Sequence, residues 1–227
     1  MDDTAATVWT DYGRFHLDRG TNPPQPERMD WGFWGDGPGD EVLGDLADCR
    51  VLDIGSGRYS VHLARAYGVV VDAVDSSPTQ YQRALDRYGE HGEPGVRFVL
   101  ADILDHLQQE EEPYDVVYAM HSFSYIDPHR LLPALTPLIR PGGRLVFSVL
   151  HTNSAGTGPI TTVAPRTEIL SLARYGELTV RMWVLTPALW EDLLVDAGFL
   201  VADITVLPAP GKDDPVTCTL ITARRRP

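Results

Sequence analysis

The sequence has few basic side chains, a single lysine and almost no cysteine. Its 227 residues contain 19 Lys and Arg against 32 Asp and Glu, a formal net charge of -13, and Lys212 is the lysine. Nucleic-acid binding depends on clustered cations that displace counterions from phosphates, so this balance disfavours a polynucleotide partner. Cys49 and Cys218 have no Cys-x-x-Cys partner. Zinc ribbons, redox dithiols and a disulfide framework therefore lack their residues.

Long apolar runs are also missing. No stretch approaches the length of a membrane span, and the first residues are acidic where a secretory signal would be basic. We therefore expect a cytoplasmic protein without a membrane partner. A chain of this length can bury a core large enough to fold without a disulfide or a structural metal. Many arginines beside one lysine favour a GC-rich bacterial source.

Residues 1–48 are rich in turn-forming and aromatic side chains, so we expect an N-terminal extension outside the main sheet. Trp9, Tyr12 and His16 recur at helical spacing, which predicts a short amphipathic helix with an aromatic face. Such a helix is suited to act as a lid over a binding pocket.

Residues 49–227 read as one domain in which apolar runs of strand length alternate with helical segments. The predicted strands cover 49–54, 69–74, 96–100, 114–119, 144–150, 178–185, 199–207 and 216–222. The predicted helices cover 58–67, 78–87, 127–139 and 187–198. Pro133 and Pro137 predict a kink or a break in the third helix, and residues 140–143 are predicted as a turn. This order predicts a doubly wound, mostly parallel seven-stranded α/β sheet with an antiparallel C-terminal hairpin. Residues 151–177, polar and broken by Gly and Pro, read as an insertion.

Ligands of doubly wound sheets bind beyond the carboxyl ends of the strands. Gly55 and Gly57 follow the first predicted strand, where glycines permit a tight turn and a close ligand approach. Asp75 ends the second strand about twenty residues later, the spacing at which a carboxylate accepts the ribose hydroxyls of an adenosine. Asp102 ends the third strand and can accept the adenine amino group, although each acid alone can equally cap a helix. Together they predict an adenosine-containing cofactor.

Two cofactor classes compete for this pattern. A dinucleotide site needs a third glycine for helix packing, and Ser60 stands there. Pyrophosphate also disfavours a carboxylate beside the glycine turn, where Asp53 lies, whereas a cationic amino and sulfonium ligand favours it. Short-chain dehydrogenases further need Tyr-x-x-x-Lys, which Lys212 does not provide. These residues favour S-adenosylmethionine over a nicotinamide dinucleotide.

At this point the sequence resembles a known family. Val51 to Gly57, Val71 to Ser76, Ala101-Asp102, Tyr114 to Tyr118 and Leu138 to Leu145 are similar, in order and spacing, to the motifs of class I S-adenosylmethionine-dependent methyltransferases with a Rossmann-like fold. The approach to the first strand looks closest to the ubiquinone and secondary-metabolite type. The resemblance implies S-adenosylmethionine as cofactor, S-adenosylhomocysteine as product, and these cofactor-binding residues: Asp53, Gly55, Ser56, Gly57, Asp75, Ser76, Asp102, Ile103 and Met120. Tyr59 stands where the family often has a third glycine.

The methyl acceptor is expected to bind near the ends of the fourth and fifth strands. His121, His151 and Tyr125 lie there, and a neutral imidazole can take a proton near pH 7. They are our candidate catalytic residues, with a loop histidine bonded to backbone as the alternative for each histidine. Aromatic side chains suited to a flat acceptor are Tyr12, His16, Trp31, Trp34 and Trp183, although core packing explains them equally well.

The sequence therefore predicts an enzyme that methylates a carbon, oxygen or nitrogen of an aromatic or heteroaromatic small molecule, in specialised metabolism such as antibiotic biosynthesis. We expect no metal site, and a monomer or a homodimer. Three alternatives remain open: methylation of an amine or carboxylate without a base, a non-catalytic S-adenosylmethionine sensor, and a nucleotide-dependent oxidoreductase.

Overall fold

The computed structural model describes residues 3–22, 24–32, 34–35, 37–55, 57–88, 93–172, 174–211 and 213–227. Its α-helices are α1 (Asp3–Leu17), α2 (Arg58–Tyr67), α3 (Pro78–Tyr88), α4 (Ile103–Gln109), α5 (Pro128–Leu135) and α6 (Pro187–Asp196). Its strands are β1 (Arg50–Ile54), β2 (Val70–Asp75), β3 (Val96–Leu100), β4 (Tyr114–Met120), β5 (Ile139–Thr152), β6 (Arg166–Leu172), β7 (Gly176–Met182), β8 (Phe199–Pro208) and β9 (Thr217–Arg225). Short 3-10 helices are η1 (Asp40–Leu43), η2 (Ser122–Tyr125) and η3 (Thr136–Leu138).

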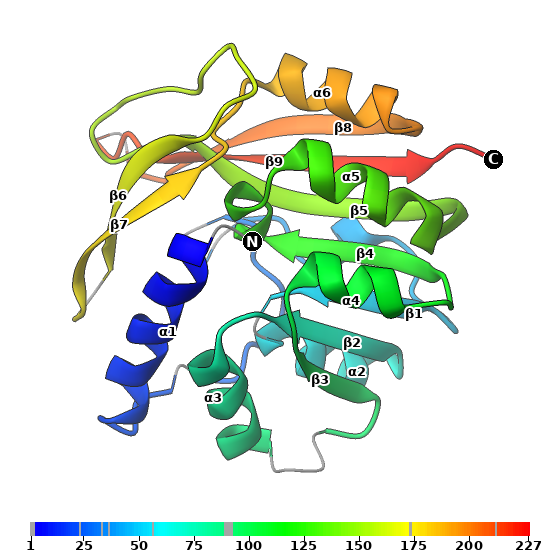
Figure 1. Ribbon diagram of the computed structural model, residues 1–227, viewed down its shortest axis with the longest axis horizontal. Helices are drawn as coiled ribbons and strands as arrows, with labels where there is room; N and C mark the ends of the chain where they lie inside the picture. Colours follow the sequence, from blue (N-terminus) through cyan, green and yellow to red (C-terminus); the bar gives the residue numbers. More distant parts are fainter. Residues whose placement is uncertain are drawn as a thin grey trace.

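Seven strands form one sheet in the order β3-β2-β1-β4-β5-β9-β8 (Figure 1). β1 to β5 pair in parallel, while β9 is antiparallel to both β5 and β8. Because β1 lies centrally and the chain moves first to one side and then to the other, the strand order reverses between β1 and β4. The predicted fold class is confirmed, and the carboxyl ends of β1, β2 and β4 meet at this reversal.

Two buried layers of apolar side chains cover the sheet. One contains Leu52, Phe147 and Trp190, all fully buried, and the other contains Val51, Tyr118 and Val146. Successive residues of a strand point to opposite faces, which is why Val51 and Leu52 belong to different layers. The nearly continuous apolar runs of β1 and β4 are thus explained by burial on both faces.

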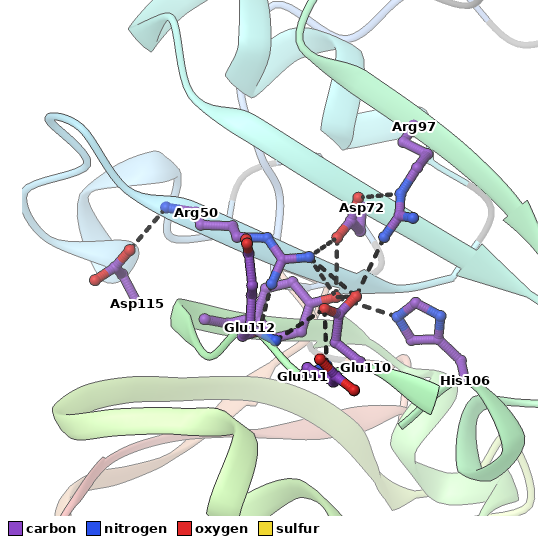
Figure 2. Close-up of polar contacts among 9 residues, drawn as sticks. Arg50, Asp72, Arg97, His106, Glu110, Glu111, Glu112 and Asp115 are labelled. Atoms are coloured by element: carbon purple, nitrogen blue, oxygen red, sulfur yellow. Dashed lines mark hydrogen bonds and ion pairs between the residues drawn. The ribbon is translucent and has the colours of Figure 1, made fainter. Parts of the chain in front are cut away.

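Charged side chains form a network of ion pairs at the end of the sheet where β1 begins (Figure 2). Arg50 Nη2, at the start of β1, lies 2.7 Å from Asp72 Oδ2 and 3.0 Å from Glu110 Oε2. Arg97 Nε lies 2.7 Å from Asp72 Oδ1, and the Tyr114 hydroxyl donates to Asp72 Oδ2 at 2.9 Å. Asp72 is only 3% exposed, and these donors compensate its burial.

The helix expected over 127–139 is broken, as its prolines predict. It ends at Leu135, because Pro137 cannot continue it, and η3 follows. Residues 140–143, predicted as a turn, lie within β5, but the β4 register jumps from Ile139 to Arg144, so these four residues protrude from the ladder.

The predicted insertion over 151–177 contains a strand that the sequence analysis did not identify, and α4 was also not predicted. β6 pairs with β7 in a separate two-stranded sheet. Its central Glu168 is 2% exposed and lies 2.5 Å from Arg166 Nε and 2.8 Å from Asn153 Nδ2. The alternation of apolar and polar residues did not indicate this strand, because a charged residue occupies a buried position. The groups that compensate its burial are brought to it by the tertiary structure.

The predicted N-terminal helix is present as α1, which lies beside α3 and β7 (Figure 1). Along the described part of the chain, no helix has the length and apolar character needed to cross a membrane.

Candidate functional site

Two adjoining cavities open at the carboxyl ends of β1, β2 and β4. The larger has a volume of about 540 Å³ and the smaller about 320 Å³. Ile54, Gly55, Met120 and His121 line both. Four residues shared by two cavities make this the point where two ligand groups can meet.

The turn after β1 has room only for glycine at one position. Gly57 has a φ of 74°, and a Cβ there would lie 2.5 Å from Phe98 Cε1 and 3.1 Å from Ala73 Cβ. Gly55 donates its N–H to the Val74 carbonyl at 3.0 Å, which ties the turn to β2. Ser56, also predicted to bind cofactor, lies outside the described residues. The turn therefore keeps bare backbone against the smaller cavity.

Asp53, at the end of β1, is held from one side by hydroxyl groups. Ser60 Oγ donates to Asp53 Oδ2 at 2.7 Å and lies 3.3 Å from the Tyr118 hydroxyl. The side chain is 5% exposed, and burial raises its pKa to about 6. Ser60 thus has a role that sequence reasoning missed: it orients the carboxylate that lines the smaller cavity.

Asp75 ends β2 and lines the larger cavity together with Ser76. Its Oδ1 accepts the Ser77 N–H at 2.7 Å, which fixes the side chain at the head of α3. Burial, with a further contribution from the charge of Asp53, raises the pKa of Asp75 to about 7. Near neutral pH, a ligand that donates hydrogen bonds to this carboxylate would favour its ionised form.

After the end of β3, neighbouring residues have different roles. Asp102 Oδ1 accepts the Leu104 N–H at 2.8 Å and caps α4, and its side chain is not among the residues that line the two cavities. Ala101 and Ile103 do line the larger cavity. Capping was the alternative for Asp102, and Ile103 offers an apolar surface for a ring.

His121 follows Met120 at the end of β4 and has a φ of 61°. Its Nε2 lies 3.4 Å from the Gly32 carbonyl, and its Nδ1 lies 3.4 Å from Ser148 Oγ. Burial lowers the pKa of His121 to about 4, so the imidazole is neutral near pH 7. It borders both cavities at their junction.

Of the other two candidate catalytic residues, only Tyr125 lines a cavity with His121. Tyr125 is 5% exposed and lines the larger cavity, with its ring 5.7 Å from that of Trp9 in an edge contact, and burial raises its pKa. His151 does not line either cavity, and its Nδ1 lies 3.0 Å and 3.1 Å from the hydroxyls of Thr152 and Thr217. The structure therefore brings Tyr125 and His121 to the same cavity but leaves His151 outside it.

The aromatic side chains considered for the acceptor are also separated. Trp34 lines the larger cavity. Trp31 is fully buried and donates its indole N–H to the Gly39 carbonyl at 3.0 Å, and Trp183 belongs to the core. Tyr12 and His16 line a third cavity of about 470 Å³. Core packing thus accounts for Trp31 and Trp183.

Sequence reasoning missed one wall of the larger cavity. It includes Ile169, Leu170 and Leu172 of β6, Met182 of β7, and Trp9, Asn153, Asp214 and Val216. Because β6 was read as part of a polar insertion, only its apolar run 169–170 hinted at this wall. Asp30, also missed, lines the smaller cavity, and its Oδ1 accepts the N–H groups of Gly32 and Gly37 at 3.2 and 3.0 Å.

Comparison with known proteins finds a family match over a segment that contributes residues to both cavities. Residues 51–143 match the family model of a methyltransferase domain. The matched segment runs from β1 to the start of β5 and includes Asp53, the glycine turn, Asp75 and His121.

Two relatives extend the match beyond residues 51–143. The O-methyltransferase resE of Aspergillus sclerotiorum is 27% identical over 167 residues, 72% of this chain and 59% of that protein. The ubiquinone biosynthesis O-methyltransferase of Vibrio atlanticus is 31% identical over 106 residues, 46% of this chain and 44% of that protein. The chain thus spans about half the length of the relatives it matches.

A solved structure supports the fold of the whole chain. The 1,6-didemethyltoxoflavin-N1-methyltransferase of Burkholderia thailandensis, with 1,6-didemethyltoxoflavin and S-adenosylhomocysteine bound, has a TM-score of 0.58 and 20% identity, covering 98% of this chain and 89% of that chain. At this identity the likeness concerns the fold.

The residues present fit S-adenosylmethionine, the cofactor that the sequence predicts. A turn that tolerates no Cβ lies beside two carboxylates, Asp53 and Asp75, whose pKa values are raised by burial, and a cationic ligand compensates that burial.

Proposed function

We propose that this protein transfers a methyl group from S-adenosylmethionine to an aromatic or heteroaromatic small molecule in specialised metabolism. One observation carries the proposal. A single cavity of about 540 Å³ runs from the cofactor-side residues Gly55, Asp75 and Ile103 to the wall formed by β6 and β7. Methyl transfer depends mainly on holding two reactants in attack geometry, and one continuous cavity allows this.

The residues of the smaller cavity suit the amino-acid end of the cofactor. Asp53 and Asp30 can accept hydrogen bonds from its amino group, and Arg58 can pair with its carboxylate. In the larger cavity, Asp75 would accept the ribose hydroxyls, Ser76 lies beside it, and Ile103 would pack on the adenine. Asp102 and Ser56 remain proposed neighbours of the cofactor. When bound, S-adenosylmethionine supplies the electrophilic methyl group.

The acceptor end of the cavity is mostly apolar. Leu150, Leu170, Leu172 and Met182 come from three different strands and would exclude water from a flat ring. Polar side chains here can orient an acceptor through hydrogen bonds: Tyr125, Asn153, Ser154, Ser171 and Asp214. Names of the two relatives favour oxygen as the methylated atom, and the toxoflavin enzyme acts on nitrogen.

We infer that His121 is the base for acceptors that must lose a proton. It borders both cavities beside Met120, and its neutral imidazole can accept a proton without first losing one. His121→Ala should lower kcat for a phenolic acceptor by about 10²- to 10⁴-fold with little change in S-adenosylhomocysteine affinity. Because burial lowers its pKa to about 4, wild-type kcat should show no loss from this group between pH 6 and 8.

His151→Ala is the matched control, since His151 lies outside both cavities. It should retain nearly full turnover. Equal activity of the wild type and His121→Ala would refute the base assignment and favour methylation without a base.

The experiment that tests the function is mass spectrometry of the purified protein incubated with S-adenosylmethionine and a panel of phenols, indoles and aromatic amines. A methylated product with equimolar S-adenosylhomocysteine is expected, and its fragmentation identifies the methylated atom. Aliphatic amines and carboxylates in the panel test the rival acceptor class. Tight S-adenosylhomocysteine binding without turnover of any acceptor would favour the sensor alternative.

A further inference from the structure

A third cavity lies between α1 and α3, and four of its twelve lining residues are arginines. It has a volume of about 470 Å³. We call it the arginine cavity; its residues are Tyr12, His16, Thr21, Asn22, Pro24, Arg58, Gln80, Arg83, Ala84, Arg87, Tyr88 and Arg174. Figure 1 shows α1 alongside α3, with β7 also beside α1.

The charge of this cavity is unusual for the chain. Arg58, Arg83, Arg87 and Arg174 line it, and no Asp or Glu does, although the protein carries a net charge of -13. Elsewhere arginines pair with carboxylates, as in Arg50–Asp72, Arg65–Glu93, Arg97–Asp72, Arg140–Asp115 and Arg166–Glu168. Within the described ranges, none of the four cavity arginines has such a partner.

Residues of this cavity also have buried polar atoms without a partner. Six buried side-chain nitrogen and oxygen atoms lack a partner in the described residues. Three of them are in residues that line this cavity: Arg58 Nε, Arg83 Nε and His16 Nε2. A buried donor without an acceptor is destabilising, so such atoms are rare and need an explanation. Burial, followed by the charges of Arg83 and other arginines, lowers the pKa of His16. Burial also lowers the pKa of Arg83.

We propose that the arginine cavity binds the phosphate or carboxylate group of a small molecule. Guanidinium groups match both oxyanions with paired N–H donors, and the four arginines that line the cavity have no carboxylate partner within the described ranges. Tyr12 and Tyr88 add ring surface for the uncharged part of the ligand. The anion would neutralise Arg58 of α2, Arg83 and Arg87 of α3, and Arg174, in the cavity beside α1.

This site is separate from the proposed methyl-transfer site. Of the residues around the arginine cavity, only Gln80 also lines the larger cavity and only Arg58 lines the smaller. The anion and S-adenosylhomocysteine should therefore bind together. The proposal goes beyond methyl transfer, and binding to the protein without S-adenosylhomocysteine tests it even if the methyl-transfer proposal fails.

The test is isothermal titration calorimetry with inorganic phosphate, phenyl phosphate, benzoate and phenol at constant ionic strength, with and without saturating S-adenosylhomocysteine. Saturable binding of an anion is expected, and neutral phenol should not bind. Arg87→Gln is the sharpest variant, because among the described residues the Arg87 side chain makes no hydrogen bond and its Cζ lies 5.2 Å from the centroid of the Tyr88 ring. Its anion affinity should fall about tenfold or more, as for loss of a charge-assisted hydrogen bond.

Arg83→Gln should produce a similar loss. Arg65→Gln is the control, because it removes the same charge from a surface pair with Glu93 and should leave anion affinity unchanged. The ratio of phenyl phosphate to benzoate affinity distinguishes a phosphate from a carboxylate ligand, and either one supports the site. Three results would overturn it: no saturable anion binding, an equal loss in Arg65→Gln, or complete displacement by S-adenosylhomocysteine, which would assign these cations to the cofactor's carboxylate.

Discussion

Asp75→Asn is expected to weaken S-adenosylhomocysteine binding by roughly 10- to 100-fold, the loss expected when charge-assisted hydrogen bonds become neutral ones. Asp75 lies at the end of β2 in the larger cavity, with Oδ1 2.7 Å from the Ser77 amide nitrogen. Asparagine has the same size and leaves the fold intact, but it carries no charge and one acceptor fewer. Calorimetric titration measures the change directly, and unchanged affinity would remove Asp75 from the ribose site.

The same variant should remove a pH dependence. Because burial raises the pKa of Asp75 to about 7, the carboxylate is mostly protonated at pH 6 and mostly ionised at pH 8. Ribose hydroxyls donate to the ionised form, so wild-type affinity should be about tenfold stronger at pH 8 than at pH 6. Asp75→Asn should show little of this difference. A wild-type affinity that is flat across this range would contradict the role of Asp75 ionisation.

The stability of the cofactor-free protein should change in the opposite direction. Asp75 has a folded-state pKa of about 7, above the ordinary value of 3.8, so the folded state binds this proton more tightly than the unfolded state. Its contribution is fully present below pH 4 and is lost as pH rises through about 7. Asp75→Asn avoids this loss, so its Tm should exceed that of the wild type at pH 8 but not at pH 4.

Asp72→Asn is the matched control on the same strand. Although burial opposes it, hydrogen bonds from Arg97 and Tyr114 hold the pKa of Asp72 below its usual value, so its charge is stabilising. This variant should lose about 1–3 kcal/mol of folding stability and keep wild-type S-adenosylhomocysteine affinity. The two aspartates would then separate ligand binding from fold stability.

Gly57→Ala is expected to lower folding stability by about 2–5 kcal/mol, the sum of a left-handed backbone penalty and an overpacked contact. The added Cβ would lie 2.5 Å from the Phe98 ring, at a backbone φ of 74°. Phe98 stacks on Tyr88 with 5.8 Å between ring centroids, so it has little freedom to move away. The displaced turn should also weaken S-adenosylhomocysteine binding. Chemical denaturation and calorimetry measure the two effects.

Gly68→Ala separates the two causes. Gly68 has a similar φ of 69°, but no atom lies within 4 Å of a Cβ built there. It should show only the backbone penalty, about 1–2 kcal/mol, with unchanged affinity. Equal losses in both variants would mean that contact with Phe98 contributes nothing.

The sequence was sufficient for the sheet and for the cofactor side of the site, because both depend on local patterns. Apolar runs of strand length and glycine turns recur in chain order, and side chains at strand ends must meet at one edge of a parallel sheet. The positions of Asp53, Gly55, Gly57 and Asp75 at that edge therefore follow from the sequence alone. The same rule identified His121, whereas the family resemblance implied Met120.

Tertiary structure alone decided the acceptor side and the arginine cavity. His121 and His151 both follow strands, but only the first turns toward the cavities. Trp31 and Trp34 stand three residues apart, yet one is buried in the core and the other lines the cavity. The β6 wall and the arginine cavity combine segments far apart in the chain, and no local pattern records which distant side chains will meet or which charges will lack a partner.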